Sequence, residues 1–347
     1  MGDKNISFSD CVRHLYIPKL NQVEKIASCG LKDWLCSSDH YIVTESSDNY
    51  IKIIYFDETD LLSAWANDIS RLSCAFLESV ANINESEVND KFLAWNLVQY
   101  YYSAFYSAHT IIKILGFGLI HFDSVAINEL HKKADIIGTP WSAQISKGIY
   151  CIQFDIKNNM IVLYNIKRYD DSHRGLWKRF LEVICIIIGK YVTTNTYGNS
   201  CIRIKQPSEA HPLSLFDKIE YRDAIDAVSR LEELESILNV SGDSNWLSGI
   251  RNQINYNHGL GSWYPYKGGS NCYDRVVKLK DLYLTNFLSE KFNTTADDKV
   301  IKYVKTCQLI NSINFDILCD MRKRNSNGKS FLQDYVFRYY SEYCRQN

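Results

Sequence analysis

The stretch DKFLAWNLVQYYYSAFYSAHTIIKIL, residues 90–115, has the strongest helical pattern in the chain. Its aromatic residues recur at the spacing of one helix face. The aromatic residues are Trp95, Tyr102, Phe105 and Tyr106, and the small residues between them are Ser103, Ala104, Ser107 and Ala108. Small side chains let a second helix approach closely, while the rings fill the gaps beside it. We expect Gly116 and Gly118 to end this helix.

The same three-to-four spacing of apolar residues predicts further helices along the chain. They cover Asp60–Ala81, Leu176–Tyr191, Tyr221–Leu238, Trp246–His258, Tyr273–Leu288, Lys299–Asp320 and Ser330–Tyr343. Two segments have the alternation and the turn residues of β-hairpins. The first pairs Tyr41–Glu45 with Tyr50–Phe56, and the second pairs Ile149–Ile156 with Met160–Ile166. The fold class is therefore mainly α, a helical bundle with short β-hairpins.

The order of these elements predicts how the chain is organised. We expect an N-terminal region at residues 1–89, with a short hairpin and a helix. Helices from residues 90–119 and 213–347 would bury their aromatic stripes against each other in one bundle. The intervening residues 120–212 would form a mixed α/β insertion that holds the second hairpin.

Composition excludes several classes of protein. A formal net charge of -1 over 347 residues excludes a protein that is basic throughout, but not a local basic cleft. The 11 cysteines include no C-x-x-C pair, which indicates reduced thiols in the cytoplasm and predicts no metal site or other cofactor. The N-terminus has no signal peptide, and the most apolar run, Val183–Gly189, is too short to span a membrane.

One short segment, GIRNQINYNHG at residues 249–259, combines an arginine, several amides and a histidine. If the helix from Trp246 extends to His258, residues seven apart share a face, so Arg251 and His258 point the same way with Asn255 between them. A guanidinium holds phosphate oxygens with paired donors, and an imidazole can move a proton near neutral pH. The pair therefore suits a phosphodiester substrate.

Together with the aromatic helix, this segment resembles the HEPN superfamily of helical-bundle proteins. Members carry an arginine followed by a polar residue, with a histidine a short distance further on. Here these residues are Arg251, Asn252 and His258, with six residues between the first and the last. The run YYYSAFYSA, residues 100–108, is similar to the tyrosine- and alanine-rich helix that packs behind the family's motif. The resemblance covers residues 90–119 and 213–347.

The resemblance implies a metal-independent endoribonuclease that works on RNA as a homodimer. It implies that His258 acts on the ribose 2′-hydroxyl or the leaving oxygen, that Arg251 holds the scissile phosphate, and that Asn252 orients the pair or the RNA backbone. RNA supplies its own nucleophile, so no cofactor is needed. Many members act in bacterial antiviral defence or as growth-arresting toxins, which implies a trigger or regulatory partner protein.

Aromatic residues follow the motif in a glycine-rich loop. Trp263 and Tyr264 can stack on unpaired bases, and together with Asn255 and Tyr256 they are the expected RNA-binding residues. The same rings would also fit a dimer interface, and the sequence leaves both possibilities open. A rival interpretation is a HEPN-like scaffold whose arginine and histidine bind nucleic acid or protein without cleaving anything.

Overall fold

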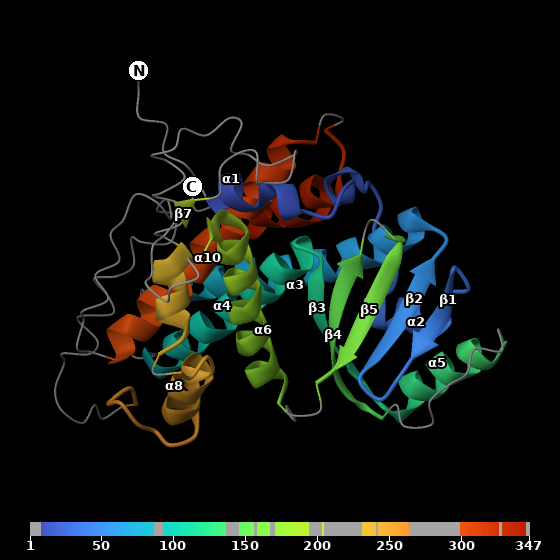
Figure 1. Cartoon of the computed structure of the whole chain (residues 1–347). Coiled ribbons are helices and arrows are strands. Elements are labelled where there is room, and N and C mark those ends of the chain that lie inside the picture. The colour runs from blue at the N-terminus through green and yellow to red at the C-terminus, as the bar shows by residue number, and fades with distance from the viewer. Residues whose placement is uncertain are drawn as a thin grey trace. The chain divides into compact units, whose positions relative to one another are not determined.

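The computed structural model describes residues 8–86, 93–136, 146–155, 158–166, 171–193, 203–204, 231–240, 242–263, 299–325 and 328–344. This part of the chain is mainly helical and contains a five-stranded antiparallel sheet (Figure 1). Its contacts divide it into two compact units. The helical unit comprises Met1–Leu15, Ser79–Ala108 and Trp177–Asp320, and the sheet unit comprises Tyr16–Glu78, His109–Leu176 and Met321–Asn347.

These units differ from the segments expected from the sequence. Each contains part of the expected N-terminal region (1–89), part of the expected bundle (90–119 and 213–347) and part of the expected insertion (120–212). The cause lies in the sheet, which takes strands from all three segments. Hydrogen bonding between strands that lie far apart in the chain therefore decides the division.

The sheet contains both predicted hairpins, which are confirmed, and one strand that was not predicted. Its order is β1 (Tyr41–Ser46), β2 (Tyr50–Tyr55), β5 (Met160–Asn165), β4 (Gly148–Asp155) and β3 (Phe117–Phe122), with every neighbouring pair antiparallel. Because β2 pairs with β5, the two hairpins belong to one sheet rather than to separate segments. A further short pair, β6 (Val192–Thr193) and β7 (Arg203–Ile204), forms a two-stranded sheet.

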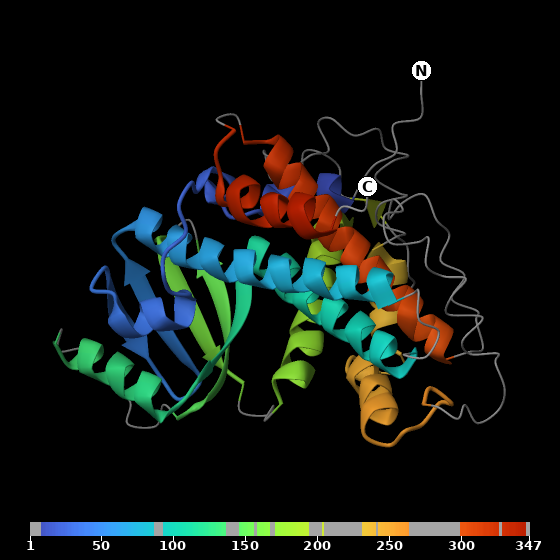
Figure 2. The same cartoon turned by 180° about the vertical axis from the view of Figure 1, so that it is seen from behind.

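One face of the five-stranded sheet carries the core of the sheet unit. Helices α2 (Leu31–Ser37), α3 (Glu58–Ser86) and α5 (Ser124–Ile136) lie on that side (Figures 1 and 2). Trp65 of α3 contacts the ring of Phe154 edge-on at 4.9 Å and donates its indole N–H to the carbonyl of Lys113 at 2.9 Å. Trp65 thus packs α3 against strand β4 of the sheet.

The predicted aromatic helix is confirmed as α4 (Leu93–Ile114), which ends just before Gly116 at a φ of +82°. The helices predicted around residues 60–81, 176–191 and 299–320 are confirmed as α3, α6 (Ser172–Tyr191) and α10 (Lys299–Lys323). The predicted C-terminal helix is largely of the wider π type, at Leu332–Phe337 and Tyr340–Cys344. The helix predicted at Tyr221–Leu238 is helical over residues 231–238 and otherwise lies outside the described residues, as does Tyr273–Leu288.

The small residues of α4 allow α10 to approach closely within the helical unit, as their pattern predicts. The Ser107 hydroxyl donates to the side-chain carbonyl of Asn311 at 2.9 Å, and the amide of Asn311 donates to the Ser103 hydroxyl at 2.8 Å. Further along, the Tyr303 hydroxyl donates to the carbonyl of Leu97 at 2.8 Å. All these side chains are buried, so the α4–α10 contact is specified by polar pairing as well as by shape.

Candidate functional site

The candidate motif begins on α8 (Trp246–Asn255), a ten-residue amphipathic helix of the helical unit. Leu247, Ile250 and Ile254 form its buried face at three- and four-residue spacing. The helix ends at Asn255, and the next residue, Tyr256, caps it by donating its backbone N–H to the carbonyl of Asn252 at 3.0 Å. It is therefore shorter than the predicted helix, which extends to His258.

This early end changes the expected geometry of the Arg251/His258 pair. His258 lies beyond the helix at a φ of 48°, in the left-handed region, and Gly259 donates its backbone N–H to the Gln253 carbonyl at 2.8 Å. A side chain at Gly259 would come within 3.3 Å of that carbonyl, so the glycine permits the reversal of the chain. The expectation that Arg251 and His258 share one helix face is therefore wrong.

Arg251 is held in a cage of aromatic rings. Only 5% of its surface is exposed, and its guanidinium carbon lies 5.0 Å from the ring centre of Tyr101, 5.8 Å from that of Tyr102 and 5.9 Å from that of Tyr256. Cations are attracted to the faces of such rings, and the attraction grows when water is excluded. The cage joins α8 to the aromatic residues of α4.

The charge of Arg251 has no carboxylate partner among the residues that the structure describes. No ion pair forms there, and its Nε atom is buried without a hydrogen-bond partner. Burial raises the pKa of Tyr101 to about 12, although the nearby guanidinium and the indole N–H of Trp177, which donates to the tyrosine hydroxyl at 3.1 Å, act in the opposite direction. A buried cation surrounded by neutral rings favours the binding of an anion.

His258 lies at the surface of the same unit, and its ring centre is 5.3 Å from that of Trp263. Trp263 is fixed because its indole N–H donates to the carbonyl of Ile254 at 2.6 Å. Its ring also meets Trp95 of α4 edge-on, with ring centres 5.8 Å apart. The segment after α8 therefore brings the predicted His258 and Trp263 together, and it adds Trp95, which the sequence reading treats as part of the packing stripe.

The other predicted site residues have fewer contacts with Arg251 and His258. Asn252 is exposed and Asn255 is half-buried, and neither side chain forms a hydrogen bond with Arg251 or His258 within the described residues. Tyr256 is 68% exposed and forms the outer side of the Arg251 cage. Tyr264 lies outside the described residues. Trp95 follows the same helix face as Tyr102 and Tyr106, and that is the only signal in the sequence that links it to the site.

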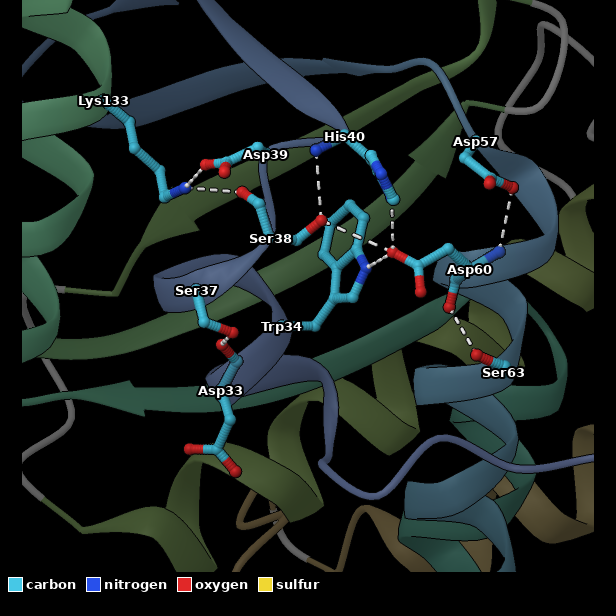
Figure 3. A network of polar contacts seen from close by, with 10 residues as sticks. All are labelled: Asp33, Trp34, Ser37, Ser38, Asp39, His40, Asp57, Asp60, Ser63 and Lys133. Atoms are coloured by element: carbon cyan, nitrogen blue, oxygen red, sulfur yellow. Dashed lines mark hydrogen bonds and ion pairs between the residues drawn. The ribbon is translucent and has the colours of Figure 1, made fainter.

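A second polar cluster lies in the sheet unit and centres on Asp60 (Figure 3). One carboxylate oxygen of Asp60 accepts hydrogen bonds from the indole of Trp34 at 2.5 Å and from the hydroxyl of Ser38 at 3.4 Å, and pairs with Nδ1 of His40 at 2.9 Å. The hydrogen bond to Asp60 raises the pKa of His40. The cluster ties α2 and the start of β1 to the first turn of α3, which is a structural role.

Across the described ranges, no group of three or more His, Cys, Asp or Glu side chains is placed to hold a metal ion. Nor does any helix there combine the length and the apolar character needed to cross a bilayer. Comparison with known proteins finds no matching family model, no matching curated protein and no matching solved structure.

Proposed function

We propose that this chain is a metal-independent endoribonuclease of the HEPN type that cleaves RNA through Arg251 and His258. The observation that carries the proposal is the buried guanidinium of Arg251, which has aromatic neighbours but no carboxylate partner among the described residues, seven positions before a solvent-exposed histidine. A scissile phosphate would supply the missing anion. We extend the proposal to a cytoplasmic homodimer that acts in antiviral defence or growth arrest under a trigger or partner protein.

In the proposed reaction, the ribose 2′-oxygen attacks the neighbouring phosphorus and forms a new P–O bond. The bond from phosphorus to the 5′-oxygen of the next nucleotide breaks. His258 takes the proton from the 2′-hydroxyl or gives one to the departing 5′-oxygen, and a homodimer would place a second histidine for the other transfer. Arg251 balances the negative charge that builds up on the phosphate oxygens. The products are a 2′,3′-cyclic phosphate and a free 5′-hydroxyl.

Access to Arg251 depends on Tyr256. This ring lies over the guanidinium and most of its own surface is exposed, so we propose that its rotation gives the phosphate access to the cation. Rotamer changes of exposed side chains take place within nanoseconds, far faster than a catalytic cycle. Asn252, which is exposed one residue after the arginine, would contact the RNA backbone.

One observation favours a second candidate function, a HEPN-like scaffold that binds nucleic acid or a protein without cleavage. Arg251 is almost fully buried and His258 lies beyond the end of α8, so the two side chains are not aligned on one helix face. A scaffold would use the caged cation to hold an anionic group and would need no proton transfer from His258.

The two candidates differ in a cleavage assay on total RNA and tRNA in the presence of EDTA. The ribonuclease should produce 2′,3′-cyclic phosphate ends, and His258→Ala should abolish them without unfolding the protein, because His258 is exposed. His121→Ala, which removes an exposed histidine from the sheet unit, is the matched control and should cleave like the wild type. Equal cleavage by the wild type and His258→Ala would refute the assignment.

A further inference from the structure

Trp95 is an exposed tryptophan at the start of α4, close to the candidate site. Half of its surface, 52%, is open to solvent, although tryptophan is among the most buried side chains on average. The orientation of its ring is restrained by an edge-on contact with Trp263, with an angle of 76° between the two ring planes. An exposed aromatic ring held in a fixed orientation is a common feature of binding sites.

Three rings form a continuous row in this part of the helical unit. Trp95 contacts Trp263, and Trp263 in turn contacts His258 at 5.3 Å. Trp263 is anchored through its indole hydrogen bond to the backbone of α8, so the row has a fixed centre. Because one ring separates Trp95 from His258, a group stacked on Trp95 would lie close to any bond on which His258 acts.

We propose that Trp95 is a stacking surface for an unpaired base of single-stranded RNA, next to the scissile phosphate. This inference rests on the proposed function, which supplies the class of ligand. Every base has a π-face, so stacking on tryptophan binds single strands with little sequence preference. A duplex offers no free base face, so the site selects unpaired RNA at the point of cleavage.

The helical unit that holds the ring row also carries positive charges that a nucleic acid would match. Arg251 carries a positive charge without a carboxylate partner among the described residues, and Lys302 of α10 lies over the ring of Trp246 of α8 at 5.8 Å. An RNA strand brings phosphates for these cations together with bases for the rings. A neutral apolar peptide would cover Trp95 but would offer nothing to these positive charges, so RNA matches both features.

The test uses a binding assay that is independent of cleavage. An unstructured oligonucleotide with 2′-O-methyl riboses at every position cannot be cleaved by 2′-oxygen attack, and its binding to the full chain is followed by fluorescence anisotropy. Trp95→Ala should weaken binding about 5- to 150-fold, the range expected for the loss of one stacked base, and Trp95→Phe should weaken it less. Phe56→Ala removes an exposed aromatic ring from the sheet unit and should leave binding unchanged.

A second measurement locates the stacked base. Single abasic positions are introduced along the oligonucleotide and tested against the wild type and Trp95→Ala. At one position the missing base should weaken binding to the wild type but should cost Trp95→Ala nothing further. If Trp95→Ala fails to fold, the same abasic series is compared between the wild type and Trp95→Phe. The missing base should then weaken binding to Trp95→Phe less than it weakens binding to the wild type.

The outcomes separate this inference from the proposed function. Binding that depends on Trp95, by a protein that cleaves no RNA, would support the stacking site and count against the ribonuclease. Cleavage dependent on His258, together with unchanged binding in Trp95→Ala, would overturn the stacking site and leave the ribonuclease intact. Equal affinity for a duplex of the same length, or no binding of the oligonucleotide by the wild type, would also overturn it.

Discussion

The guanidinium carbon of Arg251 lies 5.0 Å from the ring centre of Tyr101, whose pKa is raised to about 12 by burial. Tyr101 is therefore neutral across the physiological pH range, and it offers Arg251 a ring face rather than a negative charge. The tyrosine is held in place because the indole of Trp177 donates to its hydroxyl. The cage thus positions a cation that has no carboxylate partner among the described residues.

Replacement of Arg251 should reduce RNA cleavage without lowering the stability of the protein. In Arg251→Met, an apolar side chain of similar length replaces a buried charge that has no carboxylate partner in the described part of the chain, so the Tm should hold or rise. RNA cleavage should fall by about 100-fold or more, because the charge on the phosphate is no longer balanced. Thermal melts and initial cleavage rates measure the two effects, with the exposed Arg338→Met as control. A lower Tm with undiminished cleavage would mean that Arg251 is purely structural.

The polar contact between α4 and α10 should be sensitive to loss of its central amide. Asn311→Ala removes the partner of both Ser103 and Ser107 and leaves two buried hydroxyls with fewer hydrogen bonds. We expect a loss of about 1–3 kcal/mol in the free energy of unfolding, measured by urea denaturation. Lys305→Ala, on the same helix but only half-buried, should cost much less. Equal losses in the two variants would show that the amide contributes nothing specific.

The ion pair of the sheet unit should respond unequally to removal of its two partners. Lys113 is buried and donates to Asp68 at 2.8 Å, while Asp68 is more exposed. Asp68→Ala leaves a buried ammonium without its carboxylate and should cost about 3 kcal/mol of unfolding free energy, whereas Lys113→Met leaves a carboxylate that water can reach and should cost less. Glu58→Ala breaks the exposed pair with Lys19 and should cost under about 1 kcal/mol. The opposite order for Asp68→Ala and Lys113→Met would contradict this explanation.

The Asp60–His40 pair should make stability depend on pH. The hydrogen bond to Asp60 raises the pKa of His40 above its ordinary value of about 6.5, so the stabilisation is complete below that pH and is lost as the pH rises through the folded-state pKa. Burial would raise the pKa of Asp60, but hydrogen bonds from Trp34 and His40 outweigh it and lower the pKa, so its contribution is lost only in acid.

Urea midpoints of the wild type and His40→Ala, measured in parallel between mildly acidic and mildly alkaline pH, test this coupling. The difference between the two proteins should be largest on the acidic side of neutrality and should shrink as the pH rises. A difference that stays constant across this range would show that protonation of His40 is not coupled to the stability of the fold. Asp60→Asn, which keeps the shape of the side chain, should remove the same dependence.

Local patterns predicted the elements well where a helix or hairpin depends on its own residues. The spacing of residues 90–115 predicted α4 nearly to its ends, and Gly116 marked its stop. Both hairpins were predicted from alternation and turn residues. Local pattern does not predict strand β3, because Phe117–Phe122 follows directly on a helix and, among the described residues, pairs with β4, which lies far along the chain.

The sequence indicated residues of the candidate site but not how they are arranged in space. The sequence indicated Arg251, His258 and Trp263, and the tyrosine-rich helix beside them. It did not reveal that α8 ends at Asn255 or that His258 takes a left-handed conformation, because both depend on the close approach of Gly259 to the Gln253 carbonyl. Nor did it distinguish Trp95, which is exposed, from the other aromatic residues of the stripe.

The sequence by itself determined the two hairpins and the long helices α3, α4, α6 and α10, because the period of apolar residues is a local property of the chain. Only the tertiary structure decided that β2 pairs with β5, since the backbone hydrogen bonds of a sheet are the same for any partner strand. It also decided that Arg251 is enclosed by Tyr101, Tyr102 and Tyr256, because the burial of a charge depends on what packs around it from distant parts of the chain.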